Sequence, residues 1–371
     1  MPRRLAQAAL VLLLGCGHTE PFATPSNGTD QPFDPTPPVR LTLSPGADRW
    51  PTWLPDGSGI LYGAQELARS DRDVCLAQLL PGGGQQTMIW CDVPVGAEWT
   101  DGLLSPGVAL DGRLAYLATS HTVNGLAPEI NGLRVAPALD PFGGAVALRL
   151  PYQRAGGSIA ALSHLRWLGD DRLAFVAQSV RHRDLCPPCP QDTLVANVAV
   201  ELLTLGEAAA VPVPGTEFAS GLAALPESGD LLYTLDGDTR IFRRNLAINA
   251  VSVVHDFGAA GIARDLHLAG NRLAVVVGGR VGGIVDPVLG PMQWDSGGVI
   301  HLLDLGGGPA VALEATDRIF RRPALSPAGD RLVAEGYLVT VSRSTDPGTG
   351  QEVVDTAVGG GSDLYLFGAI Q

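Results

Sequence analysis

The chain has 371 residues, and its 38 aspartates and glutamates outnumber its 25 lysines and arginines, which gives a formal net charge of −13. A charge of this sign disfavours binding to nucleic acids and electrostatic attachment to anionic membranes, because both need a positive surface. The 47 glycines and 29 prolines, together with short alternating apolar runs, argue against a helical protein and predict an all-β fold.

The first residues of the chain have the pattern of a secretory signal peptide. A basic pair, Arg3 and Arg4, precedes an apolar run that is too short to span a bilayer. The run ends in Leu-Leu-Gly before Cys16, which resembles the site at which bacterial lipoproteins are cleaved and acylated. We therefore predict a signal peptide over residues 1–15 and a lipid on Cys16. An ordinary signal peptide beside an incidental cysteine is the alternative.

Residues 16–37 predict a disordered tether between this lipid and the folded body. The segment is rich in Pro, Thr, Ser and Asp and has no periodic apolar pattern, so it cannot bury enough surface to offset its conformational entropy. No later apolar run approaches transmembrane length, which leaves the lipid as the predicted anchor. Gly17 and His18 lack the acidic character that favours retention at the inner membrane. We therefore expect the protein to be anchored to the outer membrane, on its periplasmic or its surface face.

Four further cysteines predict two disulfide bonds, because an exported protein folds in an oxidising compartment. Cys75 and Cys91 are equidistant from Gly83, and a hairpin that turns there sets them opposite each other at a distance a disulfide can span. Cys186 and Cys189 enclose two prolines and predict a loop disulfide. A redox pair or half of a zinc site are the alternatives, but no helical context and no second ligand pair accompany them.

One pattern recurs six times along residues 38–371. Each copy has a tight turn, rich in Asp and Gly, followed by an apolar strand, and each interval has room for about four strands. The copies occupy residues 53–64, 109–118, 167–177, 225–235, 268–277 and 325–336. Intervals of roughly 40 to 60 residues are typical of propeller blades. The sequence therefore predicts a six-bladed β-propeller with four antiparallel strands in each blade.

Two of the turns resemble the Pro-Asp-Gly repeat of TolB-like propellers, namely LPDG at 54–57 and LSPAGD at 325–330. The middle four copies match it less well, and we expect the turn aspartates and glycines to be structural. The resemblance implies that residues 39–44 pair with residues 363–369, which completes the last blade and closes the ring. It also implies a protein partner in the cell envelope.

We expect function at the end of the propeller where the second strand of each blade leads to the third. The connecting segments there are long, and loops of this kind on a rigid scaffold commonly carry recognition. They cover residues 65–72, 119–131, 178–193, 278–297 and 342–361. The candidate binding residues of this rim are Arg49, Trp50, Asp101, His164, Arg181, His182, Arg264, Asp265, Trp294, Arg321 and Arg322. Arginines beside aromatic rings can anchor a partner's carboxylates; the alternative is that these charges pair with one another.

Catalytic and metal-binding motifs are not apparent. Residues 156–160 (GGSIA) depart from the G-x-S-x-G pattern at the last position, and the histidines are scattered without metal-ligand spacing. We therefore predict a monomeric, non-enzymatic protein-binding or scaffold module without a metal or cofactor. A small-ligand binder, or a hydrolase- or lyase-type enzyme with a site in the central channel, is the alternative. A propeller with no discrete site is a third possibility.

Overall fold

The computed structural model describes residues 38–43, 46–65, 74–91, 98–99, 105–118, 121–122, 132–137, 146–149, 159–184, 191–207, 209–278, 280–286, 290–295, 298–313, 318–345, 348, 350, 352–358, 361–368 and 370. The chain divides into two compact units, Met1–Pro32 and Phe33–Gln371, and every described residue belongs to the second. Within these residues, no helix is long and apolar enough to cross a bilayer.

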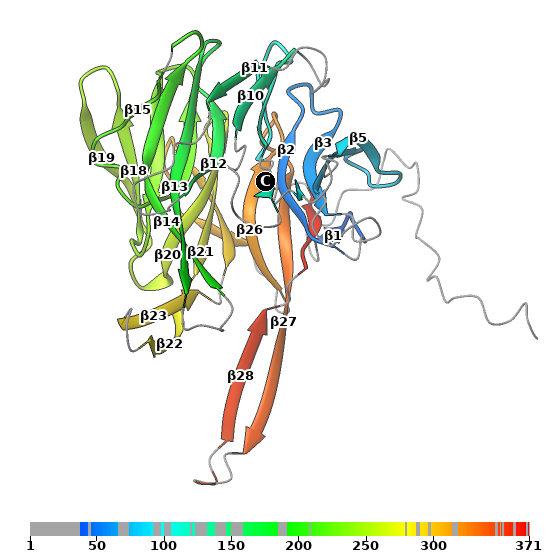
Figure 1. Cartoon of the computed structure of the whole chain (residues 1–371), viewed down its shortest axis with the longest axis vertical. Helices are drawn as coiled ribbons and strands as arrows, with labels where there is room; N and C mark the ends of the chain where they lie inside the picture. Colours follow the sequence, from blue (N-terminus) through cyan, green and yellow to red (C-terminus); the bar gives the residue numbers. More distant parts are fainter. Residues whose placement is uncertain are drawn as a thin grey trace, which may run out of the picture. The chain divides into compact units, whose positions relative to one another are not determined.

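Six four-stranded antiparallel sheets make up the fold, and we call them blades 1 to 6 (Figure 1). Blade 1 consists of β2 (Asp48–Trp53), β3 (Ile60–Gln65), β4 (Val74–Leu79) and β5 (Thr87–Cys91). Blade 2 consists of β7 (Gly107–Val108), β8 (Leu114–Ala118), β10 (Gly132–Ala136) and β11 (Val146–Arg149). Blade 3 consists of β12 (Ile159–Trp167), β13 (Arg172–Asp184), β14 (Gln191–Thr204) and β15 (Val211–Pro212). Blade 4 consists of β16 (Ala219–Leu225), β17 (Asp230–Leu235), β18 (Arg240–Asn245) and β19 (Ala250–Asp256). Blade 5 consists of β20 (Ile262–Ala269), β21 (Arg272–Gly278), β24 (Val299–Asp304) and β25 (Val311–Leu313). Blade 6 consists of β26 (Arg318–Leu325), β27 (Leu332–Thr345), β29 (Asp363–Phe367) and β1 (Val39–Arg40).

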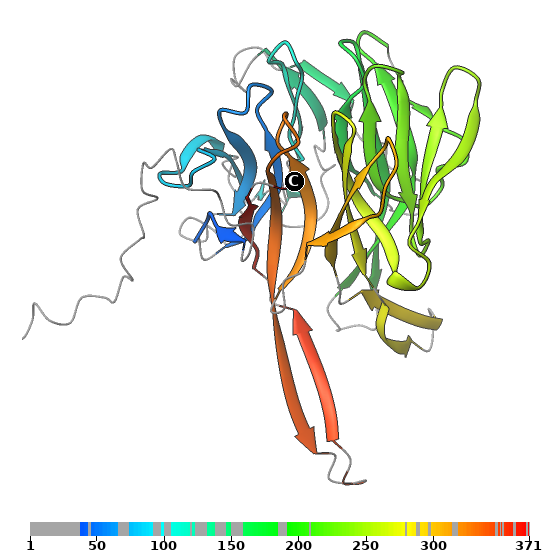
Figure 2. The ribbon, with the colours of Figure 1, turned by 180° about the vertical axis from the view of Figure 1, so that it is seen from behind.

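The first strands of the six blades form a closed ring around a common axis. Each of them contacts the first strand of the next blade, in the order β2, β7, β12, β16, β20, β26 and back to β2. The other strands of each blade follow outward from this inner strand (Figure 2). The predicted all-β, six-bladed propeller is therefore confirmed.

Apolar packing between neighbouring blades holds the ring together. The described residues contain six buried apolar clusters, and each cluster joins two adjacent blades. Between blades 6 and 1, for example, Trp53 and Tyr62 pack with Val333 and Leu364, and Leu41 covers the edge of the cluster. Burial of one large apolar side chain contributes roughly 1.5–3 kcal/mol, so the many buried side chains between blades make a large contribution to the stability.

The N-terminal strand closes the ring, as predicted. β1 pairs antiparallel with β29, with Val39 opposite Leu366. The Leu41 amide then donates to the Leu364 carbonyl oxygen over 2.7 Å. Blade 6 therefore takes its fourth strand from the opposite end of the described chain, which removes the open sheet edge that would otherwise remain.

The turn glycines have the structural role expected of them. A glycine with φ between 55° and 88° lies in the turn between the first and second strands of every blade. These glycines are Gly57, Gly112, Gly169, Gly229, Gly270 and Gly329. Residues with a Cβ rarely adopt this left-handed conformation, so the recurrent glycine follows from the tight turn.

The prediction of irregular loops between second and third strands is wrong for blades 3, 5 and 6. In blade 6, β27 continues beyond the sheet and pairs with β28 (Glu352–Val358). Blade 5 carries an extra hairpin of β22 (Arg280–Asp286) and β23 (Gly290–Asp295). In blade 3, the pairing of β13 with β14 runs to their ends. Runs such as Val-Thr-Val-Ser and Val-Val-Asp-Thr are rich in β-branched residues, which favour extended strands. A further short pair joins β6 (Glu98–Trp99) to β9 (His121–Thr122).

The register of blade 1 places Cys75 directly opposite Cys91. Cys75 is fully buried and disulfide-bonded. The Cys91 side chain is outside the described residues, so the identity of its partner rests on the register. Cys16, Cys186 and Cys189 also fall outside the described residues, and the lipid and the second disulfide stay predictions.

Replacement of Thr42 by Val tests the closure of the ring. The Thr42 hydroxyl accepts a hydrogen bond from the buried Leu364 amide over 2.9 Å. Valine has the same shape but leaves that amide unsatisfied, so Thr42→Val should lower the free energy of unfolding by about 1–3 kcal/mol in urea titrations. The reverse exchange at the exposed Val39, Val39→Thr, should change it by less than about 0.5 kcal/mol. Equal effects of the two variants would contradict the closure.

Candidate functional site

The inner strands of four blades share a bulge that brings one residue to the axis. The pairing of these strands shifts by one residue, and the residue at the shift has φ between 47° and 56°. These residues are Trp50, His164, Asp265 and Arg322. With Ser105 of blade 2 they line one small cavity on the axis. We call these five residues the axial ring.

Blade 4 contributes no side chain to the axial ring. Gly221 occupies the equivalent place when the blades are aligned on their turns. A Cβ there would lie 2.6 Å from the backbone nitrogen of Asp265 and 3.0 Å from that of Leu266. Since backbone atoms of blade 5 occupy that space, only glycine fits at this position.

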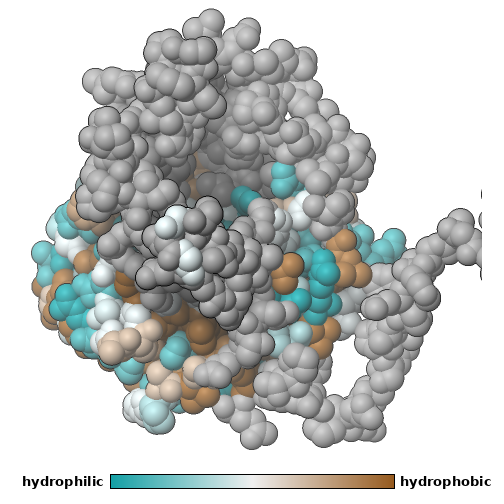
Figure 3. Space-filling view, turned by 90° about the horizontal axis from the view of Figure 1, so that it is seen from below, coloured by the Kyte–Doolittle hydropathy of each residue, from teal (hydrophilic) through white to brown (hydrophobic). Residues whose placement is uncertain are grey.

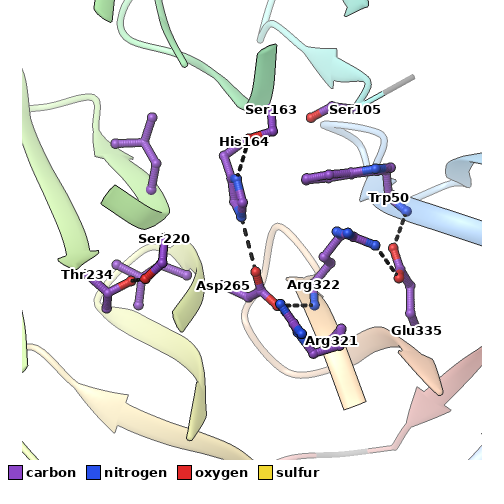
Figure 4. A network of polar contacts seen from close by, with 12 residues as sticks. Trp50, Ser105, Ser163, His164, Ser220, Thr234, Asp265, Arg321, Arg322 and Glu335 are labelled. Atoms are coloured by element: carbon purple, nitrogen blue, oxygen red, sulfur yellow. Dashed lines mark hydrogen bonds and ion pairs between the residues drawn. The ribbon is translucent and has the colours of Figure 1, made fainter. Parts of the chain in front are cut away.

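Asp265 is the centre of a buried polar network (Figure 4). Its Oδ1 lies 3.1 Å from His164 Nε2. Its Oδ2 accepts from Arg321 Nε over 2.6 Å and from the Arg322 amide over 3.2 Å. The Asp265 side chain is only 2% exposed, so its charge depends on these partners.

Glu335, on the second strand of blade 6, is the second carboxylate of the network. It is fully buried and accepts from the Trp50 amide over 2.5 Å, from Arg322 Nη1 over 2.6 Å and from the Tyr337 hydroxyl over 2.7 Å. The Arg322 guanidinium also lies over the Trp50 ring, 4.1 Å from its centroid. Arg322 therefore connects Glu335 to the Asp265 network and to an aromatic face.

The environment fixes the charge states in the ring. Burial opposes the charge of Asp265, but Arg321, with His164 and Arg322, holds its pKa well below the ordinary value. Burial lowers the pKa of His164 and outweighs the attraction of Asp265, so this imidazole is neutral at pH 7. An ionised Asp265 can only accept, and His164 therefore donates from Nε2. Its Nδ1, 3.0 Å from the Ser163 hydroxyl, accepts from that group.

Arg166 lies two residues beyond His164 and ties three blades together. Its guanidinium donates to the carbonyl oxygens of Leu165 over 2.9 Å, Leu222 over 3.1 Å and Leu266 over 3.1 Å, which belong to blades 3, 4 and 5. Burial lowers the pKa of Arg166 to about 10, although Asp265 opposes this shift. The side chain therefore carries a positive charge at pH 7.

Arg166 separates two cavities of very different size. The cavity at the axial ring measures about 10 Å³, which is room for about one water molecule. On the other side, at the ends of the inner strands, a cavity of about 310 Å³ opens to solvent, and we call it the funnel. All six blades line the funnel, through Thr52, Trp53, Pro55, Gly107, Val108, Ala109, Leu110, Leu165, Arg166, Trp167, Gly169, Asp170, Ala223, Ala224, Pro226, His267, Leu268, Ala269, Leu325 and Pro327.

The structure brings together only part of the predicted rim. Trp50, His164, Asp265, Arg321 and Arg322 meet in one network and pair with one another, as the alternative interpretation expected. Two further residues precede bulges on the inner strands β2 and β20, namely Arg49 and Arg264. The structure does not describe Asp101. It describes the backbones of Arg181 and His182 in β13 and of Trp294 in β23, but not their side chains.

The sequence did not single out Glu335, Arg166 or Gly221, and it placed His267 only near the inner-strand position that matches His164. A lone carboxylate in the apolar run Leu-Val-Ala-Glu-Gly was a detectable sign of a buried charge. Arg166 and His267 occupy equivalent places in blades 3 and 5, two residues after the bulge, which an alignment of the six copies on their turns could have found. The bulge itself leaves no periodic trace in the sequence.

The remaining described surface gives few indications of a site. Hydrophilic and hydrophobic residues are interspersed over the coloured part of the molecule seen from below (Figure 3). Among the described side chains, no three His, Cys, Asp or Glu residues lie close enough to hold a metal ion. We therefore take the axial ring and the funnel as the candidate site.

Comparison with known proteins supports the fold. A gluconolactonase from Xanthomonas campestris matches with a TM-score of 0.51 and 15% identity, over 89% of this chain and 88% of that chain. A putative gluconolactonase matches with a TM-score of 0.48 and 15% identity, over 89% of this chain and 95% of that chain. TolB from Acinetobacter baumannii matches with a TM-score of 0.33 and 13% identity, over 88% of this chain and 55% of that chain. No protein-family model and no curated protein matches the chain. At a TM-score of 0.51 and 15% identity, the Xanthomonas protein shows a common fold alone, and function has to be argued from the site itself.

Replacement of Asp265 by Asn tests whether the ion pairs of the axial ring stabilise the folded protein. Asn cannot compensate Arg321, and loss of one partner of a buried ion pair costs about 3–5 kcal/mol of unfolding free energy. The folded-state pKa of Asp265 is depressed, so its contribution is present above about pH 4 and is lost as the pH falls below that value. The difference between Asp265→Asn and wild type should therefore be large at pH 7 and shrink toward pH 3 in urea titrations. The exposed control Asp171→Asn should differ from wild type by less than about 0.5 kcal/mol in unfolding free energy. An equally small effect of Asp265→Asn would contradict a stabilising role for the charge of Asp265.

Proposed function

We propose that this chain is a lipid-anchored envelope protein that binds a partner protein at the funnel and catalyses no reaction. The observation that carries the proposal is the contrast between the two sides of Arg166. On one side the ionisable groups of the axial ring are paired, His164 with Asp265 and Arg322 with Glu335, around about 10 Å³ of space, and the groups left without a partner among the described residues are Trp50 Nε1 and Arg322 Nε. On the other side a cavity of about 310 Å³ is open and lined by every blade, and cavities of this size commonly hold ligands.

A hydrolase is the competing function, and one arrangement favours it. Ser163, His164 and Asp265 form a hydrogen-bonded chain that resembles a serine-hydrolase triad, except that His164 meets Ser163 through Nδ1 and Asp265 through Nε2, the reverse of that triad. However, Ser163 is 1% exposed and lines neither the small cavity nor the funnel. A nucleophile must lie within reach of the bond it attacks, so this chain of residues is better suited to support than to catalysis.

The funnel lies at the other end of the axis from the segments between second and third strands, where the sequence predicts long loops and the binding face. The ring residues expected to meet a partner there instead satisfy one another. Trp53 and Trp167 of the funnel are held rigidly, because their indole nitrogens donate to Ala324 and Gly107 carbonyl oxygens over 2.9 and 3.0 Å. A rigid, apolar, concave surface loses little entropy when it binds, and this favours the funnel as the binding face.

The membrane anchor is part of the proposal and rests on the sequence. Cys16→Ser should abolish the incorporation of labelled palmitate and move the protein from the membrane fraction to the soluble fraction, because no other lipid acceptor is predicted. The control Ser26→Ala, in the same predicted tether, should behave as wild type. Labelling or membrane retention of Cys16→Ser would contradict the anchor.

Photo-crosslinking in intact cells tests binding at the funnel. Leu110 lines the funnel and is 85% exposed, so a photoreactive amino acid there should not disturb the fold. We expect a crosslinked product of one defined mass from position 110. The same amino acid at Ile248, 74% exposed and outside the funnel lining, should not give this product. Identical products from both positions, or none from position 110, would contradict the proposed function.

A further inference from the structure

The floor of the funnel presents hydrogen-bond donors that the fold does not use. Arg166 has five N–H groups, and three of them bond to backbone carbonyl oxygens. Two N–H groups, one on each terminal nitrogen, have no partner among the described residues. Arg166 lines the funnel as well as the small axial cavity, and we infer that a ligand in the funnel can accept from these N–H groups.

His267 adds a second donor to the same floor. Its Nδ1 accepts from the Leu325 amide over 3.1 Å. Burial, together with the charge of Arg166, lowers the pKa of His267 to about 3, so the ring is neutral at pH 7 and its proton is on Nε2. This Nε2–H has no partner within the described part of the chain, and the residue lines the funnel.

The charge of the floor is positive in a protein that is acidic as a whole. Arg166, Arg321 and Arg322 carry three positive charges around the axis, and Asp265 and Glu335 compensate two of them. Asp265 and Glu335 do not line the funnel; the acidic residue among its described lining residues is Asp170, which is exposed, so solvent screens its charge.

The walls above this floor are apolar, and they limit what the ligand can be. Trp53, Trp167, Val108 and Leu268 line the same cavity as Arg166 and His267, and so does Leu110, which is 85% exposed. A group bound here needs an anionic acceptor at its tip and an apolar body behind it. The last residues of a polypeptide with apolar side chains have this form, because the chain end carries a carboxylate.

We propose, on the basis of the binding function above, that the funnel recognises the C-terminal carboxylate of a partner protein whose last residues are apolar. Arg166 and His267 donate to the carboxylate, and the tryptophan walls cover the terminal side chains. Charge-assisted hydrogen bonds to a carboxylate are about twice as strong as neutral ones, so the free chain end is distinguished from a blocked one.

Two matched peptide pools test this inference on the purified full-length protein. Both pools begin with a Gly-Ser linker and end in three residues drawn from Ala, Val, Leu, Ile and Phe; one has a free C-terminal carboxylate and the other a C-terminal amide. Bound peptides are identified by mass spectrometry after equilibrium dialysis. We expect the acid pool to be retained at least about tenfold more strongly than the amide pool.

Variants at Leu110 separate charge from general apolar binding without disturbing Arg166, which also supports the fold. Leu110→Glu places a negative charge at the mouth and should weaken retention of the acid pool about two- to fivefold, with little effect on the amide pool. The matched variant Leu110→Lys should retain the acid pool at least as well as wild type. Melting temperatures of both variants check that they are folded.

Three results would overturn the inference: equal retention of the two pools, equal loss of both pools in the two Leu110 variants, or retention of octanoate in preference to the acid peptides. The last would identify a small carboxylate as the ligand. Each can occur while photo-crosslinking at position 110 succeeds, in which case the funnel binds a partner by other means. Failure of the crosslink itself would instead remove the proposed function.

Discussion

Every blade of this propeller must bury two faces, and no blade can do so alone. A four-stranded blade has an apolar side toward each neighbour, and the six buried clusters of the described chain lie between blades. The last of these interfaces forms only if the chain's two ends meet, since Leu41 covers the cluster shared by blades 6 and 1. Closure is therefore a condition for the stability of the whole ring and not a local property of blade 6.

Closure has a consequence at the axis, where six inner strands converge and little space remains. The bulges bring Trp50, His164, Asp265 and Arg322 into left-handed backbone conformations, which cost free energy for residues with side chains. The ionic and aromatic contacts among these residues and Glu335 offset that cost, because each buried charge finds an opposite charge or a backbone donor. The polar character that made these residues candidates for recognition thus serves the assembly of the ring.

Sequence reasoning predicted the parts of this structure that recur and missed those that depend on neighbours. The turn glycines and the apolar strands after them repeat in every blade, so the blade number and the closing strand could be predicted. The glycine-rich segment that forms the β22–β23 hairpin shows no clear apolar alternation, so the sequence predicts a loop there. The pairing of Asp265 with Arg321 joins residues of different blades, and only the ring geometry brings them together. The role of Arg166 depends on carbonyl groups, which no sequence motif records.

The difference between blade 4 and the others explains why the free donors lie in the funnel. Gly221 leaves no side chain at the axis, and the backbone of blade 5 moves into that space. Arg166 bridges this junction by donating to Leu222 and Leu266 carbonyl oxygens, so its guanidinium is fixed before any ligand arrives. A donor held by three backbone bonds loses little side-chain entropy on binding, whereas a free surface arginine loses up to about 2 kcal/mol. The same contacts that hold three blades together therefore orient Arg166, the arginine that lines the open cavity among the described residues.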